Sequence, residues 1–242
     1  MTWAILILAA GRGSRMKHLT ANQAKPSLAV GRETLISRLI RQVSNSSIIS
    51  EIYVNCSYRA ETIIAAIPDL EGSRKVQILW ESEPLGTSRS LLAVGSRIKC
   101  GVLAIHGDLF LHDAWLEELL QDVDMDSRYS YIVTHRRKKK VARSEVIIKN
   151  TLVTSICHPD LSGSKGLSEE IWSNSGIYFV QNEHLREIDF ESLGKEEVVE
   201  GILQTLVTKG RLKAITFKGL RYSLESPEDF LDLETLLNNP LT

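Results

Sequence analysis

The sequence predicts an α/β protein with an open, mostly parallel, Rossmann-like sheet, helices on both faces and a small β insertion. Three observations support this fold class. Short apolar runs alternate with helical patterns through the first half of the chain. The segment Ala4–Ala9 is apolar without alternation, as in a strand that is covered on both faces. Short strand candidates lie close together in the second half, and the 242 residues suffice for one such domain.

The first half reads as a strand–helix alternation, in which Leu35, Leu39, Ile40 and Val43 have helical spacing. Strands are expected over 4–9, 52–55, 76–80 and 102–106, and helices over about 35–43, 60–67, 88–98 and 113–120. Pro68 ends the second helix, and Asp113 can cap the fourth. This order favours a parallel sheet.

The second half changes character. Strands are expected over 130–134, 146–148, 152–156, 177–180 and 212–217, and a helix over 196–208. Asn150 suits the turn of a hairpin, and Pro159–Lys165 reads as a loop. Ser226, Pro227 and the acids that follow start a last helix. Without an internal repeat or a linker, we expect one domain over residues 1–242.

Composition argues against several classes of partner. The net charge is −1 and the sequence pI about 6.6, so we expect neither nucleic acid nor an anionic membrane as a partner. The basic run Arg136–Lys140 is interpreted as a solvated loop, with acceptor capture or a partner contact as alternatives. Cys56, Cys100 and Cys157 fit neither a disulfide framework nor a CxxC metal site, so a reducing cytoplasm is expected. The first apolar strand is too short for a signal peptide or membrane helix. Nothing specifies an oligomeric state.

A glycine-rich loop, Leu8–Met16, follows the first strand directly. Its two glycines, Gly11 and Gly13, allow backbone amides to approach a ligand and to form an anion nest. Arg12 and Arg15 add positive charge. A loop at the carboxyl end of a parallel strand is where an open α/β sheet binds its ligand. We interpret it as a triphosphate cradle, and the alternative is a glycine-rich turn without a ligand.

Two familiar phosphate-binding motifs do not fit this loop. A Walker A loop requires GxxxxGK[ST], which the chain lacks. A dinucleotide fingerprint requires GxGxxG running into a helix, but Met16 occupies the third glycine position and the next helical pattern starts only near Thr34. Glu33 lies at a suitable distance for a ribose partner but not at a strand end. A longer loop that folds over a nucleotide is the remaining interpretation.

The loop, with Leu19-Thr20 and Lys25-Pro26, resembles the signature of sugar-phosphate nucleotidyltransferases (NTP transferases): LAAGxGxRL, then PLT, then PK. Four more segments resemble family motifs in the same order: Glu83-Pro-Leu-Gly-Thr87 (PLGT), Ile105-His-Gly-Asp108 (NGD), Asn174-Ser-Gly-Ile-Tyr178 (NAGIY) and Tyr222–Phe230 (the closing motif). The resemblance spans nearly the whole chain. It implies a GT-A-like nucleotidyltransferase fold, with a nucleotide-binding half over 1–125 and an acceptor-binding half over 126–242.

The resemblance implies that an acceptor phosphate attacks the α-phosphorus of an NTP and pyrophosphate leaves. Such a phosphate is mostly dianionic and needs no general base, so catalysis consists of positioning and charge neutralisation. The implied catalytic residues are Arg15, Lys25 and Asp108, and the implied Mg²⁺ ligands are Asp108 and Glu225. Ser223 stands where the family usually has aspartate, and Glu225, two residues on, takes over. The alternatives without a catalytic role are a surface lysine at Lys25, a turn aspartate at Asp108 and a solvent-facing glutamate at Glu225.

The implied nucleotide contacts are Leu8, Ala10, Gly11, Gly13, Ser14, Arg15, Glu81, Gly86 and Thr87, and the implied acceptor contacts are Lys25, Asn174 and Gly176. A carboxylate at Glu81 accepts hydrogen bonds, which leans towards guanine or cytosine, although main-chain groups are an alternative reader of the base. The family's EKP appears here as Cys157-His158-Pro159, without the lysine. Arg89 faces either an unusual acceptor or the helix surface.

The first hypothesis is a magnesium-dependent enzyme that forms an NDP-sugar from an NTP and a sugar 1-phosphate, for polysaccharide biosynthesis. The second is a cytidylyltransferase that acts on choline phosphate or a similar alcohol phosphate. The third is a catalytically inactive nucleotide-binding relative, because the chain departs from the family pattern at Ser223, at Cys157-His158 and at Ser88–Ser90.

Overall fold

The computed structural model describes residues 2–70, 76–123, 128–137, 144–157, 171–189 and 199–238. The chain separates into two compact units, which are described here one at a time. The first unit contains Met1–Leu85, Ile105–Leu116 and Gly219–Thr242, and the second contains Gly86–Ala104 and Glu117–Lys218. The helix expected over 196–208 and the loop Pro159–Lys165 lie partly or wholly outside the described residues.

A parallel sheet forms the centre of the first unit. Its strands are β1 (Trp3–Leu8), β4 (Ile49–Cys56) and β5 (Val76–Trp80), in the order β5-β4-β1. Every residue of β1 is buried, which confirms the prediction of a strand covered on both faces. The last two residues of β6 (Gly101–His106) also belong to this unit. Just beyond them, the amide of Gly107 donates to the carbonyl of Leu8.

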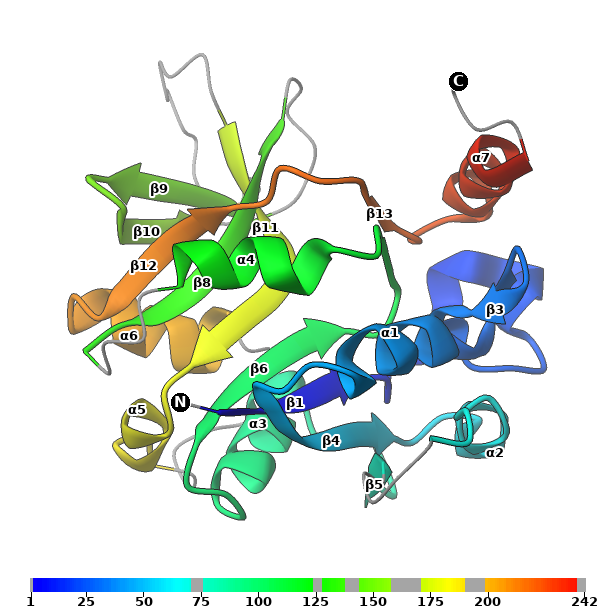
Figure 1. Cartoon of the computed structure of the whole chain (residues 1–242), viewed down its shortest axis with the longest axis horizontal. Coiled ribbons are helices and arrows are strands. Elements are labelled where there is room, and N and C mark those ends of the chain that lie inside the picture. The colour runs from blue at the N-terminus through cyan, green and yellow to red at the C-terminus, as the bar shows by residue number, and fades with distance from the viewer. Residues whose placement is uncertain are drawn as a thin grey trace. The chain divides into compact units, whose positions relative to one another are not determined.

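Helix α1 (Leu35–Ser44) lies across β1 and β4 (Figure 1). The predicted apolar stripe is buried, as expected for an amphipathic helix. Thr34 and Ser37 form a capping box, in which each side chain accepts a hydrogen bond from the other residue's amide. Helix α2 (Ala60–Ala65) follows β4 and ends before Pro68, as predicted.

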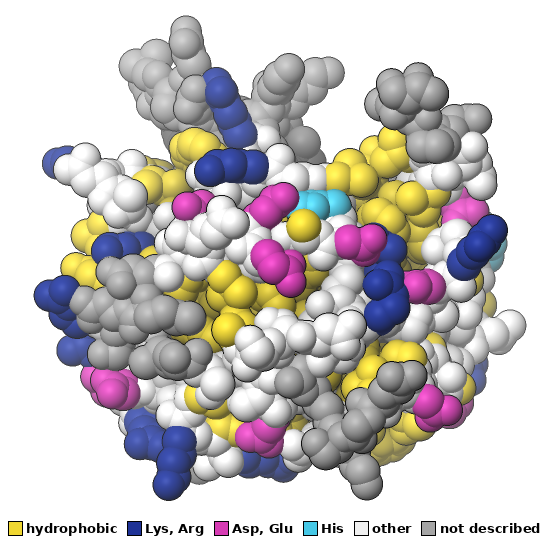
Figure 2. Space-filling view, viewed as in Figure 1, with side chains coloured by type: hydrophobic (Ala, Val, Ile, Leu, Met, Phe, Trp, Pro, Cys, Tyr) yellow, Lys and Arg dark blue, Asp and Glu magenta, His cyan; other side chains and the backbone are white. Residues whose placement is uncertain are grey.

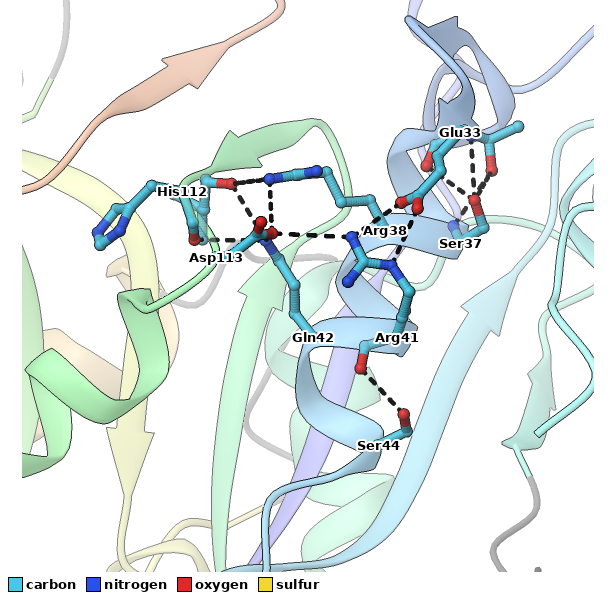
Figure 3. Close-up of polar contacts among 10 residues, drawn as sticks. Glu33, Ser37, Arg38, Arg41, Gln42, Ser44, His112 and Asp113 are labelled. Atoms are coloured by element: carbon cyan, nitrogen blue, oxygen red, sulfur yellow. Dashed lines mark hydrogen bonds and ion pairs between the residues drawn. The ribbon is translucent and has the colours of Figure 1, made fainter. Parts of the chain in front are cut away.

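The polar face of α1 holds the segment after β7 (Leu109–Leu111) (Figure 3). The Arg38 guanidinium and the Gln42 amide donate to the carbonyl of Leu111 and to Asp113 Oδ1. Asp113 is predicted to cap α4 (Trp115–Asp122), but its carboxylate accepts hydrogen bonds from Arg38 and Gln42 of α1, because these two donors face it there. Glu33, the rejected ribose partner, binds Arg41 of the same helix at 2.9 Å. These contacts fix the segment that follows Asp108.

The C-terminal segment completes the first unit. Strand β13 (Arg221–Ser223) pairs antiparallel with β7, and α7 (Pro227–Asn238) follows. The predicted start of α7 is confirmed, because the amide of Asp229 donates to Ser226 Oγ and the Asp229 carboxylate accepts from the amide of Ser226. One apolar cluster joins α7 to the start of the chain: Met16, Leu28, Val30, Leu35, Phe110, Leu224 and Leu233. Two of its members flank the short hairpin of β2 (Ala29–Val30) and β3 (Glu33–Thr34).

The second unit contains a mixed sheet, which corrects the prediction of an open, mostly parallel one. Its strands are the first four residues of β6, β8 (Ser130–Arg137), β9 (Glu145–Lys149), β10 (Leu152–Cys157), β11 (Ile171–Val180) and β12 (Leu212–Thr216), in the order β6-β11-β8-β12-β10-β9. Strands β8 and β12 are parallel, whereas β11 with β8, and β10 with both β12 and β9, are antiparallel. Strand β9 pairs with β11 as well, so this part of the sheet is partly closed.

The predicted hairpin at Asn150 is confirmed and explains part of this change of direction. Asn150 and Thr151 both have positive φ, 50° and 68°, which suits a two-residue hairpin turn between β9 and β10 (Figure 1). A tight hairpin forces its strands to run antiparallel. The helices of this unit are α3 (Thr87–Gly95), most of α4, α5 (Asn182–Arg186), η3 (Val199–Leu203) and α6 (Gln204–Thr208).

Surface charge on the face shown in Figure 2 is dispersed. Lysine and arginine side chains form separate groups among acidic, hydrophobic and uncharged ones, without a continuous basic surface among the coloured residues. Of the predicted basic run, only Arg136 and Arg137 lie within the described residues. None of the helices in the described part of the chain combines the length and apolar character needed to cross a membrane.

Candidate active site

The glycine-rich loop leaves β1 at Leu8 and folds back on Lys25. Gly13 adopts a left-handed conformation with φ of 61°, and its carbonyl accepts hydrogen bonds from Thr20 Oγ1 and the amide of Met16, each at 2.9 Å. A Cβ atom added at Gly13 would lie 3.0 Å from Lys25 Cβ. Gly13 is therefore required by both its backbone angle and the lysine beside it. A Cβ atom at Gly11 would instead meet nothing within 4 Å, so the space above that residue is open.

Lys25 and Asp108 form an ion pair at the carboxyl ends of β1 and β6. Lys25 Nζ lies 2.6 Å from Asp108 Oδ2, and the two side chains are 10% and 23% exposed. Pro26 positions the lysine, because it packs against Gly107: a Cβ atom there would lie 3.2 Å from Pro26 Cγ and 3.0 Å from the carbonyl oxygen of Leu8. The lysine-proline and glycine-aspartate motifs thus meet at one point of the sheet edge.

The surroundings of Asp108 keep its carboxyl group ionised. Burial acts to raise the pKa of Asp108, but the charges of Lys25, His106 and Arg221 and the hydrogen bond from Lys25 outweigh it, so the pKa lies below its usual value. The carboxylate is therefore charged at neutral pH. This is the state in which it can hold a lysine or a hard cation.

A second ion pair joins the glycine-rich loop to the C-terminal segment. Arg15 donates to Glu225 Oε2 at 3.2 Å, and the side chains are 76% and 24% exposed. Ser223 Oγ donates to Glu225 Oε1 at 3.3 Å. The prediction that Glu225 lies on the same strand face as Ser223 does not hold, because β13 ends at Ser223. The two side chains are instead joined by their hydrogen bond. The amide of Leu224 donates to the carbonyl of Asp108, which places this turn beside the first pair.

Glu81, the residue predicted to read the base, is buried and already hydrogen-bonded within the protein. It is 4% exposed, and its carboxylate oxygens accept hydrogen bonds from Asn55 Nδ2 at 3.0 Å and the amide of Leu85 at 3.1 Å. Asn55 was missed by sequence reasoning. The sequence does hold one signal for it: Asn55 is a polar residue near the carboxyl end of an apolar strand, where backbone groups beyond the sheet pairing need hydrogen-bond partners.

Gly86 and Thr87 belong to the second unit, at the start of α3. Gly86 has φ of 89° and ψ of 148°, a conformation that glycine adopts readily. Its carbonyl accepts hydrogen bonds from the amide and the hydroxyl of Ser90. Ser88 and Ser90, which replace the family's small residues, are buried. The motif therefore forms a glycine-dependent turn into a helix, which is a common shape for a ligand-binding loop.

The segment Asn174–Tyr178 forms a bulge in β11. Four residue steps on β11 face two on β8, since Asn174 pairs with Thr134 and Tyr178 with Ile132. Asn174 closes the bulge on itself: its Nδ2 donates to the Tyr178 hydroxyl and its Oδ1 accepts from the amide of Gly176, each at 2.8 Å. Gly176 has positive φ, 77°. The motif is thus a β-bulge that bends the strand, and such bulges are often found next to active sites.

The first unit brings together most of the predicted site residues: Leu8, Ala10, Gly11, Gly13, Ser14, Arg15, Lys25, Glu81, Asp108 and Glu225. The second unit contains Gly86, Thr87, Asn174 and Gly176. His158, the suggested partial substitute for the family's lysine, lies outside the described residues. Among the residues that are described, no group of three or more histidines, cysteines, aspartates or glutamates is arranged to hold a metal ion.

Known proteins share this sequence pattern and fold. Residues 5–173 match the family model of the MobA-like NTP transferase domain. The bifunctional protein GlmU of Methanococcus maripaludis is 26% identical over 239 residues, covering 93% of this chain and 52% of that protein. The mannose-1-phosphate guanyltransferase of Saccharomyces cerevisiae is 22% identical over 242 residues, covering 98% of this chain and 65% of that protein. The chain thus spans about half the length of the GlmU relative.

A solved structure of CTP:phosphocholine cytidylyltransferase from Streptococcus pneumoniae is similar in fold, with a TM-score of 0.74 and 18% identity, covering 98% of this chain and 100% of that one. The resemblance to NTP transferases that the sequence motifs predicted is confirmed. The α/β class is confirmed as well, although the sheet is mixed.

Proposed function

This chain belongs to the family of MobA-like NTP transferase domains, and from that premise we propose that it transfers a nucleoside monophosphate from an NTP to a sugar 1-phosphate. An oxygen of the acceptor phosphate bonds to the α-phosphorus, the bond from that phosphorus to the β-phosphate oxygen breaks, and pyrophosphate leaves with an NDP-sugar as the other product. The observation that carries the proposal is the Lys25–Asp108 pair, set beside the glycine-rich loop.

Lys25 supplies positive charge where two phosphates meet. Its ammonium group is held by Asp108 Oδ2, and the neighbouring Pro26 packs on Gly107, so little rearrangement is needed when substrates bind. A cation there lowers the repulsion between the dianionic acceptor and the α-phosphate, and it stabilises the charge that builds up in the transition state. The acceptor needs no general base, because its phosphate is mostly dianionic near neutral pH.

The glycine-rich loop and Arg15 act on the triphosphate in this proposal. The open space above Gly11 lets backbone amides approach phosphate oxygens closely. Arg15 is 76% exposed and paired with Glu225 at 3.2 Å. An exposed pair of this kind is weak, so a triphosphate can draw the guanidinium away and pyrophosphate can leave against it.

We propose Asp108 and Glu225 as the ligands of Mg²⁺. Both offer oxygen atoms, which this ion prefers, and both side chains are about one quarter exposed. The low pKa of Asp108 keeps it ionised, and Ser223 can orient Glu225. When bound, the ion would neutralise phosphate charge and orient the triphosphate.

The second unit, taken by itself, holds four further residues with proposed roles. Gly86 and Thr87 border the nucleotide, and Asn174 and Gly176 line the acceptor pocket. The division into a nucleotide half, 1–125, and an acceptor half, 126–242, within a single domain stays a prediction. So does a cytoplasmic location, where NTPs and sugar phosphates are made. Because the chain spans about half of the GlmU relative, the proposal covers nucleotidyl transfer alone.

Pyrophosphate release, measured with each of the four NTPs and a panel of sugar 1-phosphates, tests this proposal. We expect turnover with one NTP and at least one sugar 1-phosphate, dependent on Mg²⁺. NTP binding without turnover on any acceptor would instead identify an inactive nucleotide-binding relative.

One observation favours a second candidate. The family usually has an aspartate at the position of Ser223, but here it is Glu225 that pairs with Arg15 of the glycine-rich loop. An acidic residue at the position of Glu225 resembles some choline-phosphate cytidylyltransferases. Including CTP with choline phosphate in the same panel separates the two reactions.

A further inference from the structure

Three hydrogen bonds form a side-chain ladder in the interior of the first unit. The amide of Ala9 donates to Asn55 Oδ1 at 2.5 Å, Asn55 Nδ2 donates to Glu81 Oε1 at 3.0 Å, and the amide of Leu85 donates to Glu81 Oε2 at 3.1 Å. We call these four residues the Asn55–Glu81 ladder. Asn55 is 2% exposed and Glu81 is 4% exposed, so water does not compete freely for these groups.

The ladder lies across the carboxyl ends of three adjacent parallel strands. Leu8 of β1 pairs with Asn55 of β4, and the next residue of β4, Cys56, pairs with Trp80 of β5. The amide of Glu81 then donates to the carbonyl of Cys56 at 2.9 Å. The side-chain bonds therefore continue the sheet by one step, at the point where its backbone pairing ends.

Two loops of the proposed nucleotide site start at this ladder. The glycine-rich loop leaves β1 through Ala9, which is followed directly by Ala10 and Gly11. The PLGT-like loop leaves β5 through Glu81 and contains Leu85. The ladder thus fixes the backbone of one loop against the backbone of the other, although about 70 residues separate them in the chain.

The chemistry of the ladder allows one arrangement of donors and acceptors. The Ala9 amide requires an acceptor, which fixes Asn55 Oδ1 towards it and Asn55 Nδ2 towards Glu81. An ionised carboxylate accepts with both oxygens, as the Asn55 and Leu85 donors require. An asparagine and a carboxylate are therefore the matched pair for this chain of contacts, and a buried network of this kind is sensitive to any reversed group.

We propose that Asn55 and Glu81 are positioning residues, which set the spacing between the phosphate-binding loop and the PLGT-like loop and so preorganise the protein for the NTP. The inference rests on the proposed function for the identity of the ligand. In this role Glu81 acts through Leu85 and Asn55. A residue that reads the base directly would not depend on Asn55.

A reciprocal exchange tests the ladder. Asn55→Asp places a carboxylate against Glu81, and Glu81→Gln turns one acceptor into a donor facing Asn55 or the Leu85 amide. Each single change leaves a reversed buried bond, so we expect the Kd for the NTP to rise about tenfold or more. The double variant Asn55→Asp/Glu81→Gln restores the three donor–acceptor matches of the ladder and the net charge, so its Kd is expected within about threefold of the unaltered protein.

The measurements are calorimetric titration with each of the four NTPs and Mg²⁺ at about pH 8, where two facing carboxylates are less able to share a proton. Amide hydrogen exchange of Ala9 and Leu85, without any nucleotide, provides a readout that is independent of activity. We expect exchange at both amides to accelerate in the single variants and to return in the double variant. Glu61→Gln, which removes an exposed carboxylate from α2, serves as the control and is expected to change neither quantity.

Specific outcomes overturn the ladder. If Glu81→Gln changes which NTP is preferred while Asn55→Asp leaves all Kd values unchanged, Glu81 reads the base itself. If the double variant is as weak as the worse single variant, the two residues do not act as a matched pair. If a single variant does not fold, recovery of folding together with NTP affinity in the double variant decides the question. If no NTP binds to the unaltered protein, the proposed function fails, and the exchange rates still decide whether the ladder joins the loops.

Discussion

The two ion pairs of the candidate active site have the same chemistry and very different surroundings. Lys25 and Asp108 lie 2.6 Å apart, with side chains 10% and 23% exposed, and are held by the packing of Pro26 on Gly107. Arg15 and Glu225 lie 3.2 Å apart, and the arginine is 76% exposed. Water and salt screen the second pair but act little on the first. We infer that Lys25 is in place before substrates arrive, whereas Arg15 moves towards a bound triphosphate.

Removal of the buried pair is expected to have the largest effect. Lys25→Ala and Asp108→Ala should each lower kcat by at least about 100-fold, because preorganised charge at the reacting phosphates is lost. Pyrophosphate release gives the rate, and circular dichroism confirms that each variant is folded. Lys99→Ala, which removes an exposed lysine, is the matched control and should leave kcat unchanged. Near-normal rates in either site variant would refute the role of the buried pair.

The metal role of the exposed pair comes next in size. Glu225→Ala should raise the Mg²⁺ concentration for half-maximal rate by about tenfold, since one proposed oxygen ligand is lost. Ser223→Ala should raise it by less, because Ser223 only orients the carboxylate in our proposal. A titration of rate against Mg²⁺ compares the two. An equal or larger effect at Ser223 would transfer the ligand role to the serine.

The loop between the two pairs offers a matched glycine comparison. Gly13→Ala should lower the free energy of unfolding by about 1–2 kcal/mol, because its φ is 61° and the new Cβ would lie 3.0 Å from Lys25 Cβ. Gly11→Ala should change it by less than about 0.5 kcal/mol, since the space there is open. Urea unfolding measures both. Equal costs at the two positions would contradict the described backbone of the loop.

The smallest expected effect is on thermal stability at the exposed pair. Arg15→Ala should shift Tm by less than about 2 °C, because an exposed ion pair contributes little to folding. The same variant should weaken NTP binding, and scanning calorimetry with and without NTP separates the two quantities. A large drop in Tm without nucleotide would mean that Arg15 has a structural role after all.

The sequence predicted local features well. The burial of β1, the apolar stripe of α1, the hairpin at Asn150 and the cap at Ser226 all follow from periodicity and turn chemistry within a few residues. The direction of a strand is set by its partner, and antiparallel partners such as β10 and β12 are far apart in the sequence. The mixed sheet could not be predicted for that reason.

The candidate site residues also separate into those found through local motifs and those that depend on distant partners. Lys25 and Asp108 were identified through motifs, and their contact is now explained by packing between those motifs. Asn55 carries no motif, and the role proposed for it depends on two hydrogen bonds, to Ala9 and to Glu81, which follow the ends of other strands. Asp113 looked like a helix cap locally, but arginine and glutamine donors from α1 engage its carboxylate. Long-range polar partners are the information that local pattern lacks.

The return of the last segment to the first unit has a consequence for how the protein is made. Arg15 and Glu225 are 210 positions apart, and β13 pairs with a strand that is synthesised long before it. At about 5–20 residues per second, a ribosome takes roughly 10–40 s to cover that distance. Strand β7 precedes β13 by about 110 positions, so it lacks this partner for roughly 6–22 s, and until then the apolar cluster lacks Leu224 and Leu233. The nascent chain therefore carries an unfinished first unit, whose apolar surface stays uncovered until these residues are made.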